Sequence, residues 1–219
     1  MFKRSVVLLC VVISFVFSVP SQASETSVRE VSVDQLKKVL LTLPWSISDH
    51  EEKAPAREAR ALKMSQALVE SAKEELSSRD RRALIAAVVS IWWSETRFSH
   101  EVHRGEPSRW GSDDGRAKCF GQLHVGRVGI QIQEGETLQE FRVRQHEAWQ
   151  ALAGTDFEAT KRCAEATMKA FKSSLSLCRS SKRPWVSAFG EYGAGDGSCR
   201  ELPQSPGRYR LALKIAAKL

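Results

Sequence analysis

Apolar residues follow one another almost without interruption from Ala83 to Trp93, and Glu95 closes this run. The run predicts a helix that is buried nearly all round, because it holds hardly a polar side chain over three turns. Short polar residues at 77–80 supply side-chain oxygens that cap the first amide groups of a helix. An acid at the inner end of such a helix is poorly solvated, which favours the neutral carboxyl that a general acid needs. The pattern also fits a helix that simply surfaces at Glu95, and both interpretations stay open here.

Amphipathic periodicity predicts further helices on both sides of this run. Their expected ranges are 31–43, 55–75, 137–152, 157–177, 185–192 and 208–219. Residues 99–135 are rich in glycine and polar side chains, so we expect irregular loops and a small hairpin of short strands there. The chain therefore predicts a mainly α fold, in which a glycine-rich insert follows the central helix.

The first residues have the layout of a secretory signal peptide, which we expect to cover residues 1–23. Lys3 and Arg4 form the basic start, residues 5–19 are apolar, and Ser21-Gln22-Ala23 is a small-residue cleavage site. The apolar part is short for a membrane span. We expect an exported protein, periplasmic or secreted, with no stable insertion in a membrane.

The formal net charge of the chain is +7 at pH 7. A basic balance fits three kinds of partner: nucleic acid, anionic lipid or an anionic cell-wall polymer. The basic residues are spread out and alternate with acids, as at 57–60, and they form no compact Lys/Arg tract. We therefore expect no nucleic-acid partner, and we expect most of the charges to lie on solvated helix faces. We also expect the protein to be a monomer.

Cys119, Cys163, Cys178 and Cys199 follow the predicted signal peptide. An even number of cysteines in an exported protein predicts two disulfides, for which three pairings are possible. We favour Cys163 with Cys178 and Cys119 with Cys199.

A metal site is not expected. No two of these cysteines have the spacing of a zinc knuckle. His100, His103, His124 and Glu101 are the other potential ligands. The two nearest histidines follow the central helix in a loop, with no carboxylate at ligand spacing on a shared helical face.

Glu95-Thr96-Arg97-Phe98 resembles the Glu-Ser-x-Phe that ends the catalytic helix of lytic transglycosylases (SLT) and goose-type lysozymes, with Thr in place of Ser. In that family the Glu is the single general acid, and it acts on the glycosidic oxygen of peptidoglycan. The resemblance implies a lysozyme-like α+β fold of mainly helical content, Glu95 as the acid, and no cofactor.

A second segment, 117–123, resembles the family's Ala-x-Gly-Leu-Met-Gln-hydrophobic, which lines the sugar cleft. The resemblance assigns substrate contacts to Phe120 and Gly121, and to Gln122 a part in holding the catalytic loop.

Just upstream, residues 110–115 resemble the Trp-Gly-Asp-x-Gly of goose-type lysozymes, with one extra residue. There the Asp helps to activate water, which makes Asp113, and after it Asp114, the candidate second acid. A plain turn is the alternative, because Asp and Gly supply what turns require. We expect Trp110 to face the cleft.

A third segment, 189–197, resembles Ala-Ala-Tyr-Asn-Ala-Gly-x-Gly, with Gly193 in place of Asn. The resemblance places Tyr192 beside the catalytic Glu and the cleaved sugar. Glycine at 193 lets the backbone approach a substrate closely, although a glycine that caps a helix is the alternative.

The three segments occur in the family's order and define the expected domains. We expect 79–219 to form a lysozyme-like catalytic domain and 24–78 to form a helical extension packed on it.

The implied reaction is cleavage of the β-1,4 bond between MurNAc and GlcNAc in peptidoglycan glycan strands. Asp113 would make the enzyme a hydrolase, which we favour, whereas attack by a muramic acid hydroxyl would make it a lytic transglycosylase. The altered residues 119–121 suggest de-N-acetylated glycan as a substrate. The non-enzymatic alternatives are an inactive peptidoglycan-binding protein and a cationic membrane-active protein.

Overall fold

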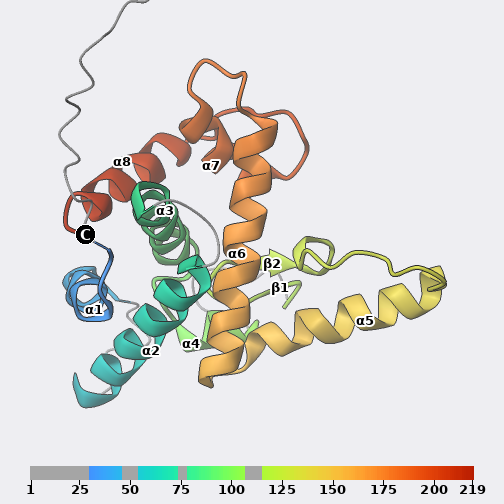
Figure 1. The fold of residues 1–219 in the computed structure, drawn as a ribbon, viewed down its shortest axis with the longest axis horizontal. Helices are drawn as coiled ribbons and strands as arrows, with labels where there is room; N and C mark the ends of the chain where they lie inside the picture. Colours follow the sequence, from blue (N-terminus) through green and yellow to red (C-terminus); the bar gives the residue numbers. More distant parts are fainter. Residues whose placement is uncertain (1–29, 46–53, 74–77, 107–114) are drawn as a thin grey trace, which may run out of the picture.

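The computed structural model describes residues 30–45, 54–73, 78–106 and 115–219. They form a mainly helical fold, as predicted, with one two-stranded antiparallel sheet (Figure 1). The α-helices are α1 (Val33–Thr42), α2 (Ala54–Lys73), α3 (Ser78–Thr96), α4 (His100–Arg104), α5 (Leu138–Gln150), α6 (Phe157–Leu177), α7 (Pro184–Ala194) and α8 (Ser205–Ala216). The strands are β1 (Ala117–Lys118) and β2 (Leu123–His124), and short 3₁₀ turns cover Val125–Arg127 and Ala151–Ala153.

α3 is the central helix of the core. Its residues from Ile85 to Trp92 are almost completely buried, which confirms the burial expected from the apolar run. α8 packs along α3, and α2 packs along α6 (Figure 1). Burial of this many apolar side chains is the main force that holds the helices together.

α4 is a helix that the sequence pattern did not predict. It lies inside the stretch expected to be irregular, and it ends at Gly105, whose φ of +74° suits glycine. A helix this short has little periodicity of its own. Tertiary contacts hold it, since buried His103 packs its ring 4.2 Å from that of Phe120.

The structure contains the two disulfides that the cysteine count predicts, but the favoured pairing is wrong. Cys119 is bonded to Cys163, and Cys178 is bonded to Cys199. Cys163 lies within α6 and Cys178 directly follows it, so a straight helix separates them by about 22 Å. A disulfide requires Cα atoms less than about 7 Å apart. The two bonds indicate an oxidising compartment.

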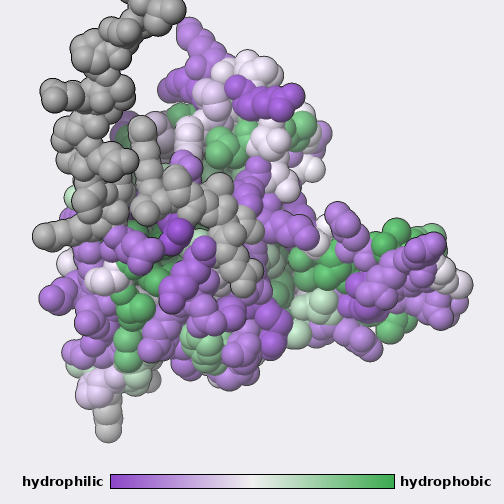
Figure 2. Space-filling view, viewed as in Figure 1, coloured by the Kyte–Doolittle hydropathy of each residue, from purple (hydrophilic) through white to green (hydrophobic). Residues whose placement is uncertain are grey.

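α5 projects from the body of the protein together with the segment that precedes it (Figure 1). Its base is anchored where Trp149 donates a 2.8 Å hydrogen bond to the carbonyl of Leu123. Hydrophobic residues gather along this arm (Figure 2), among them exposed Ile132, Leu138 and Val143.

None of the helices in the described part of the chain is both long enough and apolar enough to cross a membrane. The predicted signal peptide, residues 1–23, lies outside the described residues.

Candidate active site

Glu95 lies in the last turn of α3, where the buried helix reaches solvent. Its side chain is 23% exposed, whereas Trp92, one turn earlier, is completely buried. Neighbouring Trp93 donates a 2.8 Å hydrogen bond to the carbonyl of Pro44, which ties the end of α3 to the segment after α1. The carboxylate is therefore carried by a helix whose position the core fixes.

α3 ends directly after Glu95 because Thr96 and the next two residues redirect the chain. The Thr96 hydroxyl donates to the carbonyl of Trp92 at 2.8 Å and accepts from the amide of Phe98 at 3.1 Å. Arg97 and Phe98 have φ values of 51° and 61°, in the left-handed region that non-glycine residues rarely adopt. Strain of this kind is often found beside functional sites.

Arg208 is the ionic partner of Glu95, and the sequence pattern did not single it out. Arg208 Nη2 lies 2.7 Å from Glu95 Oε1, and the Arg208 side chain is only 8% exposed. The carbonyl of Arg208 accepts a 2.7 Å hydrogen bond from Ser90 Oγ, so α8 is bound to α3 at both points. An arginine within an amphipathic helix looks like a solvated charge until the packing of that helix is known.

The loop between β1 and β2 lies beside this site. Cys119 and Gln122 have φ values of 65° and 49°, and the amide of Gln122 donates to the carbonyl of Cys119 at 3.0 Å. The Gln122 side chain donates to the carbonyls of Cys119 and Val102, each at 3.1 Å. Gln122 thus holds its own loop and ties that loop to α4.

Tyr192 joins this loop to α7. Its hydroxyl donates a 2.6 Å hydrogen bond to the carbonyl of Gly121. Burial raises the pKa of Tyr192 well above its usual range, and the negative charge of Glu95 raises it further. Tyr192 is therefore a neutral hydrogen-bond donor close to Glu95.

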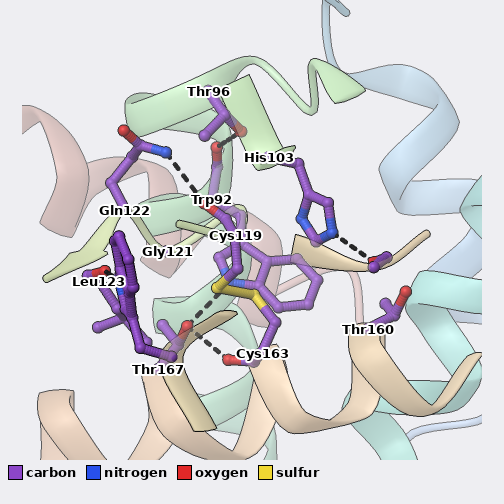
Figure 3. Close-up of a disulfide and its surroundings, with 12 residues drawn as sticks. Trp92, Thr96, His103, Cys119, Gly121, Gln122, Leu123, Thr160, Cys163 and Thr167 are labelled. Carbon is purple, nitrogen blue, oxygen red and sulfur yellow. Dashed lines mark hydrogen bonds between the residues drawn. A yellow bond between two sulfur atoms is a disulfide. The ribbon is translucent and has the colours of Figure 1, made fainter. Parts of the chain in front are cut away.

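Gly121 is required by the packing of α6 against this loop. A Cβ atom on Gly121 would overlap Thr167 Oγ1 and lie 2.9 Å from the Tyr192 hydroxyl. Thr167 Oγ1 accepts from Trp92 Nε1 at 3.2 Å and donates to the carbonyl of Cys163 at 2.7 Å (Figure 3). Thr167 belongs to the buried face of α6 and carried no signal in the sequence.

Phe120 and Gly193 have different surroundings. The Phe120 side chain is 1% exposed and lies in the core, with its ring 5.2 Å from that of Trp92. A Cβ atom on Gly193 would lie 3.1 Å from Leu202 Cδ1 and 3.7 Å from Arg208 Nη1. Gly193 therefore lies on the Arg208 side of the site.

Arg127 covers the end of α7. Its guanidinium donates to the carbonyl of Tyr192 at 2.5 Å and to that of Glu191 at 3.3 Å. These two bonds satisfy carbonyls near the helix C-terminus, where the partial charge is negative. Arg127 is a further residue that only the folded chain brings to the site.

Asp113, Asp114 and Trp110 lie outside the described residues. Their expected roles as second acid and sugar contact stay predictions. Among the described site residues, the structure brings together Glu95, Gly121, Gln122, Tyr192 and Gly193.

The histidines considered as metal ligands have surroundings that disfavour a cation. Burial, together with the nearby charges of Arg60 and Arg104, lowers the pKa of His100 to about 3. His103 Nε2 is engaged at 2.7 Å with the carbonyl of Gly154. The cysteine sulfurs are in disulfides and are not free to bind metal.

No family model matches the chain, and neither a curated protein nor a solved structure matches it. The resemblance to lytic transglycosylases and goose-type lysozymes therefore rests on the three short sequence motifs alone.

Proposed function

We propose that this chain cleaves the β-1,4 bond between MurNAc and GlcNAc in peptidoglycan, with Glu95 as the general acid. One observation carries the proposal: Glu95, the loop at 119–122 and Tyr192 are far apart in the sequence and adjacent in the fold. These are the segments that resemble lytic transglycosylases and goose-type lysozymes. The two disulfides fit a periplasmic or secreted enzyme that acts on a cell wall.

Cleavage of a glycosidic bond needs a proton for the leaving oxygen and a nucleophile for the anomeric carbon. Arg208 binds Glu95 Oε1, so we assign the proton transfer to Oε2. Neutral Tyr192 keeps the Gly121 carbonyl in place and gives the loop a fixed position beside the acid. The proton passes from Glu95 to the leaving oxygen as the bond from that oxygen to the anomeric carbon breaks.

Two nucleophiles are compatible with this acid. In hydrolysis, Asp113 or Asp114 takes a proton from water as the water oxygen bonds to the anomeric carbon. In the lytic route, the C6 hydroxyl of muramic acid bonds to the same carbon and returns its proton to Glu95. We favour hydrolysis because residues 110–115 resemble the water-activating segment of goose-type lysozymes.

Mass spectrometry of soluble muropeptides released from purified walls tests the proposal. We expect the wild-type protein to release muropeptides and Glu95→Gln to release none while still sedimenting with walls. Glu147→Gln, an exposed carboxylate on α5, is the matched control and should keep full activity. Reducing-end products indicate hydrolysis, and products lighter by one water indicate the lytic route. Full activity of Glu95→Gln would overturn the proposal.

A non-catalytic peptidoglycan-binding protein is the second candidate. The observation that favours it is the Glu95–Arg208 ion pair, which engages the carboxylate that should carry the proton. In this case the wild-type protein would sediment with walls and release no muropeptides. Cosedimentation and muropeptide release, measured on the same sample, separate the two functions.

Residues 119–121 suggest which form of peptidoglycan glycan the enzyme prefers as a substrate. Cys119-Phe120-Gly121 replaces the Gly-Leu-Met that contacts N-acetylated sugars in the resembling family, and the Cys119–Cys163 bond ties this loop to α6. We propose de-N-acetylated glycan as a substrate, because its amine is cationic and Asp113, Asp114 or Glu101 would favour it. Digestion of acetylated and chemically deacetylated walls compares the two, and equal or faster cleavage of acetylated walls rules this preference out.

A further inference from the structure

We propose that Arg208 is the positioning residue of Glu95: it holds the carboxyl group in place and stabilises the carboxylate left after proton transfer. This inference rests on the proposed function, because it assigns a role within the same site. Arg208 is not expected to touch the sugar, since its side chain is more than nine-tenths buried behind Glu95.

Arg208 contacts α3 through both its side chain and its backbone. Its guanidinium binds Glu95 at 2.7 Å, and its backbone carbonyl accepts a 2.7 Å hydrogen bond from buried Ser90, on the same helix as Glu95. Both ends of the Arg208 residue are therefore held by one helix. The backbone of Arg208 therefore has a fixed position relative to the helix that carries Glu95.

The pair is poorly built for stability alone. In the described part of the chain, Arg208 Nε and Nη1 are buried and have no hydrogen-bond partner. A buried ion pair contributes to stability only when hydrogen bonds satisfy its remaining groups, and an unsatisfied buried donor is costly. From a guanidinium that is kept buried at this cost, with one nitrogen bound to Glu95, we infer a role in the chemistry of Glu95.

Gly193 adds a second link between this pair and the site. It replaces the Asn of the resembling motif, and a side chain there would extend toward Leu202 and Arg208 Nη1. Because residue 193 has no side chain, it offers the Arg208 guanidinium no partner that would compete with Glu95.

The charge of Arg208 suits the acid step. Glu95 gains a negative charge as its proton passes to the leaving oxygen, and a fixed guanidinium beside it stabilises that charge without reorganisation. Lysine cannot reproduce this geometry, because its ammonium is a compact point charge on a flexible stem. The effect should appear in kcat rather than KM, since the charge develops only during the reaction.

Steady-state kinetics on soluble peptidoglycan fragments test this role. We expect Arg208→Gln to lower kcat about 10- to 100-fold, with KM within about twofold of wild type, and Arg208→Lys to recover part of the loss. Arg210→Gln, an exposed arginine on the same helix, is the control and should be unchanged. Unchanged kcat for Arg208→Gln beside an inactive Glu95→Gln overturns the inference alone. A raised KM with unchanged kcat also overturns it, because it would make Arg208 a substrate-binding residue.

Chemical rescue separates lost charge from lost packing. Methylguanidinium at tens of millimolar should restore part of the kcat of Arg208→Ala, whereas the same concentration of urea should not. No rescue, together with full activity of the wild-type protein, contradicts the assigned charge effect.

Thermal unfolding tests the pair without any activity. We expect Glu95→Gln to lower Tm, because it leaves a buried guanidinium unpaired, and Glu95→Gln/Arg208→Met to regain part of that loss. Purely additive Tm changes would contradict the coupling on which the inference depends. A wild-type protein that releases no muropeptides overturns the proposed function and the catalytic role of Arg208, even where the two Tm changes are coupled.

Discussion

The Tyr192 hydroxyl donates a 2.6 Å hydrogen bond to the carbonyl of Gly121, which lies 71 residues earlier in the chain. This bond joins α7 to the loop between β1 and β2, next to the carboxylate of Glu95. Both groups are buried, so neither has water as an alternative partner. The Tyr192 hydroxyl therefore links the loop to α7, in addition to the Cys119–Cys163 disulfide that links it to α6 and the Gln122 side chain that links it to α4.

Tyr192→Phe removes this hydroxyl and leaves the Gly121 carbonyl without its donor. An unsatisfied buried carbonyl costs about 1–3 kcal/mol, so the free energy of unfolding should fall by that amount. Muropeptide release should also slow, because the loop beside Glu95 loses its hydrogen bond to α7. Urea unfolding and the muropeptide assay measure the two effects. Tyr209→Phe, on α8, is the matched control, and an equal loss of activity in both variants would contradict the role of the Tyr192 hydroxyl.

Gly121→Ala places a methyl group against Thr167 Oγ1 and the Tyr192 hydroxyl. We expect a loss of about 1–3 kcal/mol in unfolding free energy, since an overpacked core must shift. Gly126→Ala is the control, because a Cβ atom on Gly126 meets no atom within 4 Å and its φ is not positive. Equal stability of the two variants would show that the loop relaxes freely.

His103 makes the stability of the fold depend on pH. The pKa of His103 is lowered from 6.5 to about 4, chiefly by burial and further by the charges of Arg104 and Arg60, while the hydrogen bond to Gly154 acts in the opposite direction. Between pH 6.5 and 4 the unfolded chain binds the proton and the folded chain does not. This stability is therefore present above pH 6.5 and is lost as the pH falls toward 4, by about 3 kcal/mol in full.

Urea unfolding at pH 7 and pH 5 measures this loss. His103→Phe should weaken the dependence on pH, whereas His146→Gln, an exposed histidine on α5, should leave it unchanged. A dependence that persists undiminished in His103→Phe would assign it to other groups.

The two disulfides should differ in their contribution to stability. They span sequence separations of 44 and 21 residues, and closure of the longer loop removes more entropy from the unfolded chain. Replacement of both cysteines by serine should cost about 4 kcal/mol for Cys119–Cys163 and about 3 kcal/mol for Cys178–Cys199. Peptide mapping without reduction checks the pairing itself, and a Cys163–Cys178 peptide would contradict the structure.

Helix positions could largely be predicted from the sequence. The range 157–177 coincides with α6, and the polar residues at 77–80 mark the start of α3 at Ser78. Apolar periodicity and capping residues act locally, so they are visible in a single sequence. α4 escaped prediction because its five residues carry too little periodicity.

The disulfide pairing was predicted wrongly although the relevant information was present. Cys163 lies within the predicted helix 157–177 and Cys178 directly follows it, which already keeps the two residues about 22 Å apart. Proximity along the chain favours short loops, but a rigid helix between two cysteines prevents their approach. The predicted helix thus excluded the pairing that the spacing suggested.

The sequence by itself determined the helical class, the buried central helix and the position of Glu95 at its end. These follow from periodicity and capping, which depend on neighbours within a few residues. Only the tertiary structure decided that Arg208 would bind Glu95, that Thr167 would require glycine at 121, and that Tyr192 would hold the loop. Such contacts join residues far apart in the chain, and they exist only after the helices have packed.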